Sequence, residues 1–151
     1  MSVPAQIILL ILQALQVAFL WLHDWIPLGR LNNLTALRGQ DSRARRIVVT
    51  LVQSVPFTLG LAFSAAHFAA PWPHWLGQWL WISYGILFCG QLRAWWIPYL
   101  GPADAVRAAR YQLIFAGTHA FLPRRNGMVP NTLHVLLHVS TLATLLTLWF
   151  C

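Results

Sequence analysis

The sequence contains no lysine and no glutamate, and its only acidic residues are three aspartates. A water-soluble chain of 151 residues needs a largely charged surface, but charged residues make up only 9% of this chain. The scarcity of carboxylates also excludes a di-iron carboxylate bundle, because such a bundle uses several glutamate ligands. The composition therefore argues against a soluble domain.

Sequence motifs of the common hydrolases and nucleotide-binding proteins are missing as well. The chain has neither a Walker A loop nor a G-x-G-x-x-G sequence, and no serine lies in G-x-S-x-G or S-x-x-K. His134 and His138 have H-x-x-x-H spacing, but they lack the intervening Glu that serves as the general base of a zinc protease. The sequence therefore identifies no reaction.

The chain is instead rich in apolar residues, which make up 58% of it and fall in long runs. Four such segments, at 3–26, 47–70, 75–97 and 129–150, are each long enough to cross a hydrocarbon core of about 30 Å as a helix. We therefore expect an all-α integral membrane protein, a four-helix transmembrane bundle that forms a single domain over residues 1–151. Segment 102–116 begins with Pro102 and carries Asp104 in its first turn, which predicts a short interfacial helix before the last span.

All ten arginines lie within or beside the two long connections between these segments. The 71–74 connection and both termini contain none, so the positive-inside rule places both termini on the non-cytoplasmic side. The net charge of +7 is thus explained by membrane topology, with anionic lipid as the nearest partner and no nucleic acid. The small size and the use of arginine alone favour a bacterial inner membrane.

Polar side chains gather near the predicted cytoplasmic ends of the spans. Because such side chains are costly in hydrocarbon, we expect them to face the bundle interior, as His134 and His138 would do together with Asn131 on one helix face. The predicted ligand-binding site at the cytoplasmic leaflet comprises His23, Asp24, Arg93, His119, Asn131, His134 and His138.

The expected ligand of this site is an anionic lipid or another amphiphile, because arginine beside interfacial aromatic residues binds phosphate or carboxylate head groups. Asp24 and Arg93 have similar predicted depths and are expected to form an ion pair. One alternative is a non-catalytic accessory or assembly subunit. In that case the small-residue face Gly60-x-x-x-Ser64 would bind other membrane subunits or a second copy of the chain.

A second alternative is a metal- or haem-binding membrane protein. Two neutral imidazoles at i and i+4 can hold one metal, and a single haem would need facing histidines at matching depth, as His23 and His134 are predicted to be. The candidate metal ligands are His134, His138, His23 and His119. Histidines that only make structural hydrogen bonds would need no cofactor, and this is the more common case.

Overall fold

A computed structural model describes residues 2–102 and 104–150 and is all-helical, with 74% of the chain in helices and no strand in these ranges. The four long helices are α1 (Val3–Leu22), α3 (Arg43–Ala66), α4 (His74–Gln91) and α7 (Thr132–Trp149). The helix α4 continues through a π-helical segment, η2 (Leu92–Trp96), into α5 (Ile97–Leu100). The shorter elements are η1 (Gly29–Leu31), α2 (Leu34–Gln40) and α6 (Ala105–Phe115).

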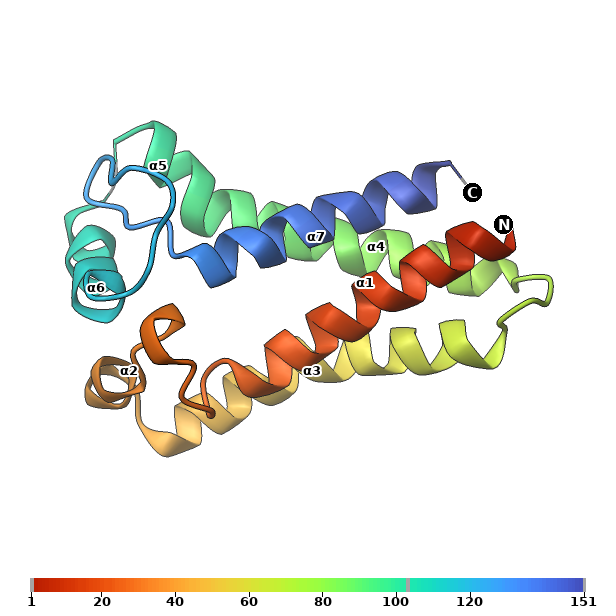
Figure 1. The fold of residues 1–151 in the computed structure, drawn as a ribbon, viewed down its shortest axis with the longest axis horizontal. Coiled ribbons are helices and arrows are strands. Elements are labelled where there is room, and N and C mark those ends of the chain that lie inside the picture. Colours follow the sequence, from red (N-terminus) through yellow and green to blue (C-terminus); the bar gives the residue numbers. More distant parts are fainter. Residues whose placement is uncertain (1, 103, 151) are drawn as a thin grey trace.

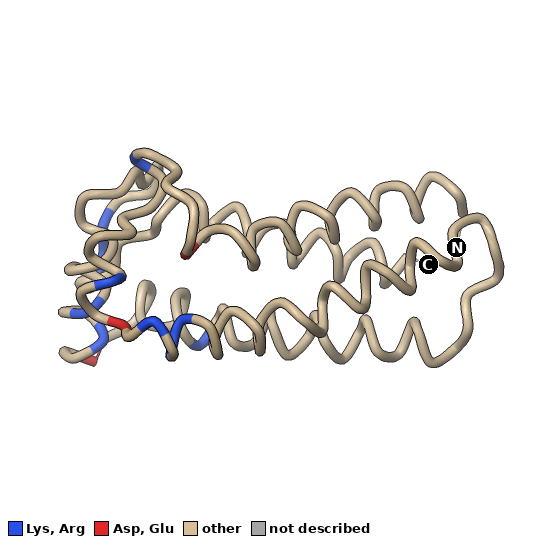
Figure 2. The backbone as a smooth tube through the Cα atoms, turned by 90° about the horizontal axis from the view of Figure 1, so that it is seen from below, with Lys and Arg blue, Asp and Glu red and all other residues tan. Residues whose placement is uncertain are grey.

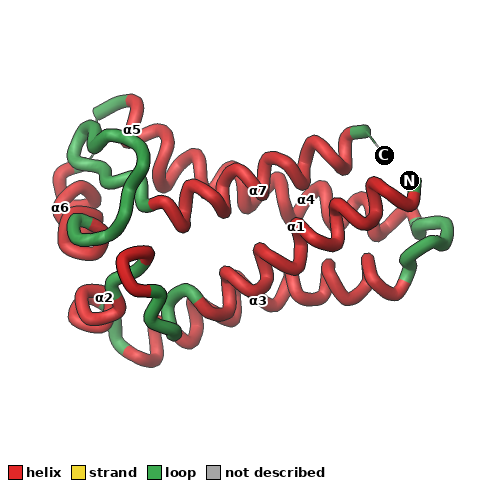
Figure 3. The backbone as a smooth tube through the Cα atoms, in the orientation of Figure 1, coloured by secondary structure: helices red, strands yellow, loops and turns green. Residues whose placement is uncertain are grey.

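The long helices run along the long axis of the molecule, with α2, α5 and α6 at one end and both chain ends at the other (Figure 1). Contacts join α1 to α3, α3 to α4, α4 to α7 and α7 to α1, so each long helix packs against two others. The loops lie at the two ends of the molecule (Figure 3). This arrangement places the irregular connections together, at the end where α2 and α6 lie.

One long helix overlaps each of the four predicted apolar segments, but α3 begins at Arg43, four residues before its predicted segment, and α1 ends at Leu22, before the predicted boundary at residue 26. By length and composition, α1, α3 and α7 are apolar enough to cross a membrane. The helix α4 does not meet the same criterion, because His74, Gln78 and Gln91 lie within its 18 residues. The short helix expected at 102–116 is observed as α6, and the Asp104 carboxylate caps it by accepting a hydrogen bond from the Val106 backbone N–H at 3.0 Å.

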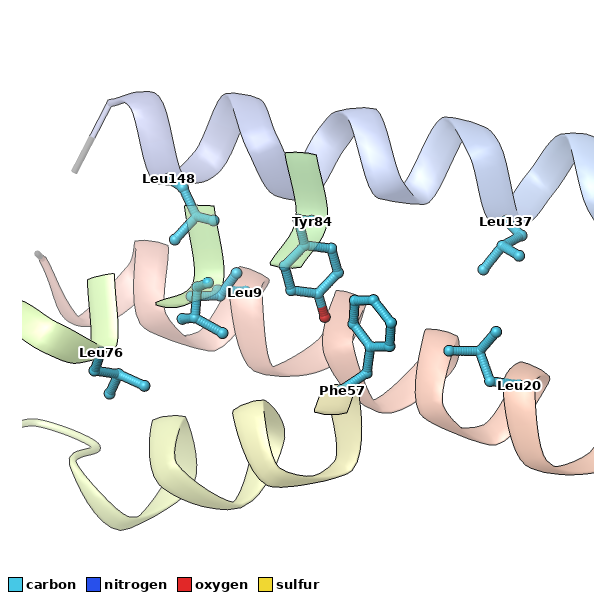
Figure 4. Close-up of a cluster of buried hydrophobic side chains, with 8 residues drawn as sticks. Leu9, Leu20, Phe57, Leu76, Tyr84, Leu137 and Leu148 are labelled. Atoms are coloured by element: carbon cyan, nitrogen blue, oxygen red, sulfur yellow. The ribbon is translucent and has the colours of Figure 1, made fainter. Parts of the chain in front are cut away.

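A core of apolar side chains lies between the four long helices (Figure 4). Its buried members are Leu9, Leu20, Phe57, Leu76, Leu80, Tyr84, Leu137 and Leu148. Gly60 allows α3 to approach α4 closely, because a Cβ at this position would lie 3.0 Å from Leu80 Cδ2. Ser64, one turn further along α3, is also buried. The small-residue face Gly60-x-x-x-Ser64 therefore packs within this chain.

Several polar side chains of the long helices lie between the helices, and many apolar side chains outside the core point outward. Gln16 is buried and donates from its Nε2 to Thr144 Oγ1 at 2.9 Å. Gln91 Nε2 donates to the buried Thr141 Oγ1 at 3.0 Å. The exposed residues of the same helices include Ile8, Ile11, Leu15, Val48, Val52, Ile82, Ile86, Leu136, Val139 and Leu146. Large apolar side chains therefore cover much of the outer surface of the bundle, which is unusual for a water-soluble domain.

Candidate functional site

A cavity of about 540 Å³ lies between the long helices, at the end that carries α2 and α6. Side chains of α1, α2 and α3 line one wall, and side chains of α4, α6 and α7 line the other. The apolar lining includes Leu20, Leu87 and Ile114. The polar lining consists of His23, Asp24, Asn32, Asn33, Asp41, Gln53, Gln91, Arg110, Tyr111, His134 and His138. The cavity is therefore amphipathic.

His23 follows the last residue of α1 and lies in the cavity wall beside Asp24. Its Nδ1 is 2.8 Å from the Phe19 carbonyl oxygen, which can only accept a hydrogen bond, so Nδ1 carries the hydrogen. Its Nε2 is 3.2 Å from Asp24 Oδ1. At this distance the imidazole and the carboxylate would form an ion pair if the ring were protonated. His23 and Asp24 are therefore direct neighbours in the cavity wall.

His134, in the first turn of α7, is held in place by Asn131. The buried Asn131 Oδ1 accepts from the His134 backbone N–H at 3.2 Å and from its Nδ1 at 3.0 Å. The Asn131 Nδ2 donates to the Leu31 carbonyl oxygen and to Thr118 Oγ1, both at 2.8 Å. This one amide therefore ties the start of α7 to η1 and to the loop that follows α6.

The three cavity histidines form one aromatic cluster with Trp95. The His134 ring stacks on Trp95 with 4.7 Å between ring centroids, and it meets the His23 ring edge-to-face at 5.5 Å. The His138 ring lies 6.5 Å from His134 and 5.7 Å from Trp95. Trp96 Nε1 donates to His138 Nδ1 at 3.1 Å. The π-helical segment η2 supplies both tryptophans, so this irregular turn helps to build the site.

An ion pair joins the two short helices at the same end of the cavity. Asp41 is the residue after α2, and its Oδ2 accepts a hydrogen bond from Arg110 Nη2 of α6 at 2.7 Å. Arg45 Nη1 lies 3.3 Å from the other oxygen of that carboxylate. Beside Arg110, the Tyr111 hydroxyl donates to the Ala94 carbonyl oxygen at 3.1 Å. Burial raises the pKa of Tyr111 to about 12, although the charges of Arg107 and Arg110 act in the opposite direction.

The structure brings four of the seven predicted site residues together around the cavity: His23, Asp24, His134 and His138. His134 and His138 face inward, as predicted, and His23 approaches His134. Asn131 is buried next to His134 but does not line the cavity.

The remaining two predicted site residues do not line the cavity either. Arg93 is exposed on η2, and His119 is exposed, with its Nδ1 2.8 Å from Thr132 Oγ1. The predicted Asp24–Arg93 ion pair is wrong, because the Asp24 carboxylate pairs with His23 instead. The prediction rested on similar depth alone, and depth does not determine which way a side chain points: Asp24 lines the cavity, whereas Arg93 is exposed on η2.

The donor groups fit hydrogen bonding better than metal coordination. Across residues 2–102 and 104–150, no group of three or more His, Cys, Asp or Glu side chains is placed to hold a metal ion. For haem, His23 has neither nitrogen available, since one bonds the Phe19 carbonyl and the other faces Asp24.

The sequence-based prediction missed four residues that line the cavity, namely Asp41, Trp95, Arg110 and Tyr111. One sequence signal could have identified Asp41. It is one of three carboxylates in a chain with ten arginines, so an arginine partner elsewhere in the sequence was to be expected.

Comparisons of this chain with protein-family models, with curated proteins and with solved structures give no match. A functional hypothesis must therefore be derived from the cavity and its surroundings.

Proposed function

We propose that this chain is an integral membrane protein in which α1, α3, α4 and α7 form a transmembrane four-helix bundle. Three of these helices have the length and apolar composition of membrane spans. The outward-facing apolar and inward-facing polar side chains suit a hydrocarbon solvent, since polar groups must then find partners inside the protein. The less apolar α4 fits this arrangement, because Gln91 bonds Thr141 within the bundle and the exposed Ile82 and Ile86 face outward.

The proposed orientation places the α2–α6 end in the cytoplasm and both termini outside. The arginines gather at that end, opposite the two chain ends (Figure 2). Positive residues are retained on the cytoplasmic side during insertion, which supports this orientation.

Cysteine labelling tests this orientation in a background in which Cys89 and Cys151 are replaced by Ser. A cysteine at the exposed His74 (His74→Cys) should react with an impermeant thiol reagent added to intact cells. A cysteine at the exposed Thr35 in α2 (Thr35→Cys) should react only after the membrane is permeabilised. The reverse pattern would reject the orientation.

The function that we propose for the bundle is binding of an amphiphile at the cytoplasmic leaflet. The observation that carries this proposal is the amphipathic cavity, whose exposed rim residues include Val49 and Gln53 of α3 and Ile86 of α4. In a bilayer this rim would face the acyl chains, so a lipid tail could lie along the apolar wall while its head group enters among the histidines.

The negative charge expected for the head group of the ligand has no support from the residues around the cavity. The expectation of an anionic head group depends on a free arginine in the site, and Arg93 does not line the cavity. Arg110 does line it, but its guanidinium is already bonded to Asp41. We therefore propose an amphiphile without this requirement for negative charge.

Blocking the cavity tests the proposed function. Gly90 of α4 lines the cavity and a Cβ there would meet no atom within 4 Å, so Gly90→Leu should fill the rim without a clash of its Cβ. Gly85 lies on the same helix, has similar free space and does not line the cavity, so Gly85→Leu is the matched control. Native mass spectrometry of detergent-purified protein should show co-purified lipid on the parent and on the control, and at least about tenfold less on Gly90→Leu. Equal lipid retention by both variants would reject the cavity as the binding site.

A further inference from the structure

The charged side chains that line the cavity are already paired with one another or with a neighbour. Among the lining residues that the structure describes, the permanently charged types are Asp24, Asp41 and Arg110. Asp41 bonds Arg110 at 2.7 Å, and Asp24 lies 3.2 Å from His23 Nε2. A charged head group would therefore have to break one of these pairs or stay unpaired at a depth where water is scarce, and both are costly.

The hydrogen bond from Trp96 determines which nitrogen of His138 carries the hydrogen. An indole N–H can only donate, so His138 Nδ1 must be the unprotonated acceptor of that 3.1 Å bond. In a neutral ring the hydrogen then lies on Nε2. No hydrogen-bond acceptor for this Nε2 is found in the described part of the chain, so His138 presents a free donor at the cavity.

In His134 the hydrogen of the neutral ring lies on the other nitrogen, Nδ1. The Asn131 amide has a defined orientation, because its Oδ1 accepts the His134 backbone N–H while its Nδ2 donates to the Leu31 carbonyl. The same Oδ1 can therefore only accept from His134 Nδ1, which must carry the hydrogen. In the neutral ring, His134 Nε2 is then a free acceptor. The two rings thus offer one donor and one acceptor, with 6.5 Å between their centroids.

We infer that the cavity selects a lipid whose head group is uncharged and bears at least one hydroxyl group. A hydroxyl group both donates and accepts, so a single hydroxyl, or two neighbouring ones, can donate to His134 Nε2 and accept from the N–H of His138. A carboxylate or a phosphodiester anion could accept from His138, but it carries no hydrogen for His134 and finds no free cation. This inference rests on the proposed function, because it names the class of amphiphile that the same cavity binds.

Two lipids with identical tails separate the inference from the proposed function. Native mass spectrometry in a neutral maltoside detergent would compare 1,2-dioleoylglycerol with dioleoyl phosphatidylmethanol, an anionic phosphodiester without a hydroxyl group, on the parent chain and on Gly90→Leu. Gly90→Leu should abolish only binding to the cavity, so any phosphatidylmethanol held by surface arginines would remain bound. We expect the dioleoylglycerol to occupy the cavity at least about tenfold more tightly than phosphatidylmethanol.

The outcomes have different consequences. Equal or tighter cavity binding of phosphatidylmethanol would overturn the inference and leave the proposed function standing. A different result would overturn both the inference and the proposed function. In that result Gly90→Leu would change the binding of neither lipid, and the variant would also keep its co-purified lipid.

A pair of substitutions at His138 tests the donor directly. Asparagine keeps an oxygen near the position of Nδ1 for Trp96 but has no group in place of Nε2, whereas glutamine can place an N–H near Nε2. His138→Asn should weaken dioleoylglycerol binding about five- to tenfold, as expected for one lost hydrogen bond, and His138→Gln should stay within about twofold of the parent. Equal binding by the parent and both variants would overturn the assignment of His138 as the donor.

Discussion

The four long helices pack differently at their two ends. Toward the chain termini, closely packed apolar side chains occupy much of the space between them, and Leu9, Leu76 and Leu80 are at most 1% exposed, although Gln6 and Gln13 are buried there as well. Toward α2 and α6 the helices enclose the cavity, and hydrogen bonds from Asn131 and the Asp41–Arg110 ion pair connect the elements.

This difference suggests that one end of the bundle mainly stabilises the fold and that the other end mainly serves the proposed binding. Close packing of apolar side chains tolerates few changes in volume, so the end near the termini is suited to hold the helices together. Polar contacts around a cavity leave some donors and acceptors free, as at His134 and His138. The two ends should therefore respond differently to substitutions.

The largest effect is expected from Asn131→Ala, at the polar end. This change removes the partner of the Leu31 carbonyl, of Thr118 and of two His134 nitrogens, and it should lower the free energy of unfolding by about 3 kcal/mol. Reversible unfolding in mixed micelles, followed by circular dichroism, would measure the loss. Asn126→Gly is the control, because Asn126 is exposed, its Nδ2 donates to the Tyr99 carbonyl oxygen only at the surface, and its φ of +50° suits glycine. Its effect should stay below about 0.5 kcal/mol, and a similar loss in both variants would contradict the role of Asn131.

A leucine pair tests the comparison of the two ends most directly. Leu80→Ala leaves a void where α4 packs against α3, and it should lower the free energy of unfolding by about 2–3 kcal/mol. Leu37→Ala, in the cavity wall formed by α2, enlarges a space that already exists and should cost less than about 1 kcal/mol. The same unfolding measurement applies to both, and the comparison fails if Leu37→Ala is the more damaging.

A glycine pair should show a smaller difference of the same kind. Gly85→Ala meets no atom within 4 Å and should gain up to about 1 kcal/mol, because alanine favours the helix. Gly60→Ala brings its Cβ to 3.0 Å from Leu80 Cδ2, and this leucine is too closely packed to move freely. The two variants should therefore differ by about 1 kcal/mol in the free energy of unfolding, with Gly60→Ala the less stable. Equal stability would show that α3 and α4 can separate at this point.

Much of the fold could be predicted from the sequence, because helices follow from local features. Each apolar run produced a helix near its expected place, and Asp104 caps α6 as its position in the sequence suggests. The π-helical turn at Leu92–Trp96 could not be predicted, since it depends on how Trp95 and Trp96 pack against the histidines of α7.

The candidate site was predictable only in part, for a related reason. His134 and His138 are four residues apart on one helix, so the sequence places them on one face. Asp41 and Arg110 are 69 residues apart and meet only because α2 packs against α6. Contacts of this kind depend on tertiary structure, which periodicity does not describe.

A pH dependence is expected at the polar end, at Tyr111. Burial raises the pKa of this phenol to about 12, above the value of about 10 of an unfolded tyrosine. The folded state therefore keeps the proton where the unfolded state has lost it. The stabilisation by neutral Tyr111 is complete below about pH 10 and is lost as the pH rises to about 12.

Tyr111→Phe cannot ionise, so its unfolding free energy should decline less than that of the parent chain between these pH values. Tyr99→Phe is the control, because the Tyr99 hydroxyl donates to the Pro123 carbonyl at the surface. Parallel pH profiles of the parent chain and Tyr111→Phe would show that Tyr111 is accessible to water, and hence that this wall of the cavity is open.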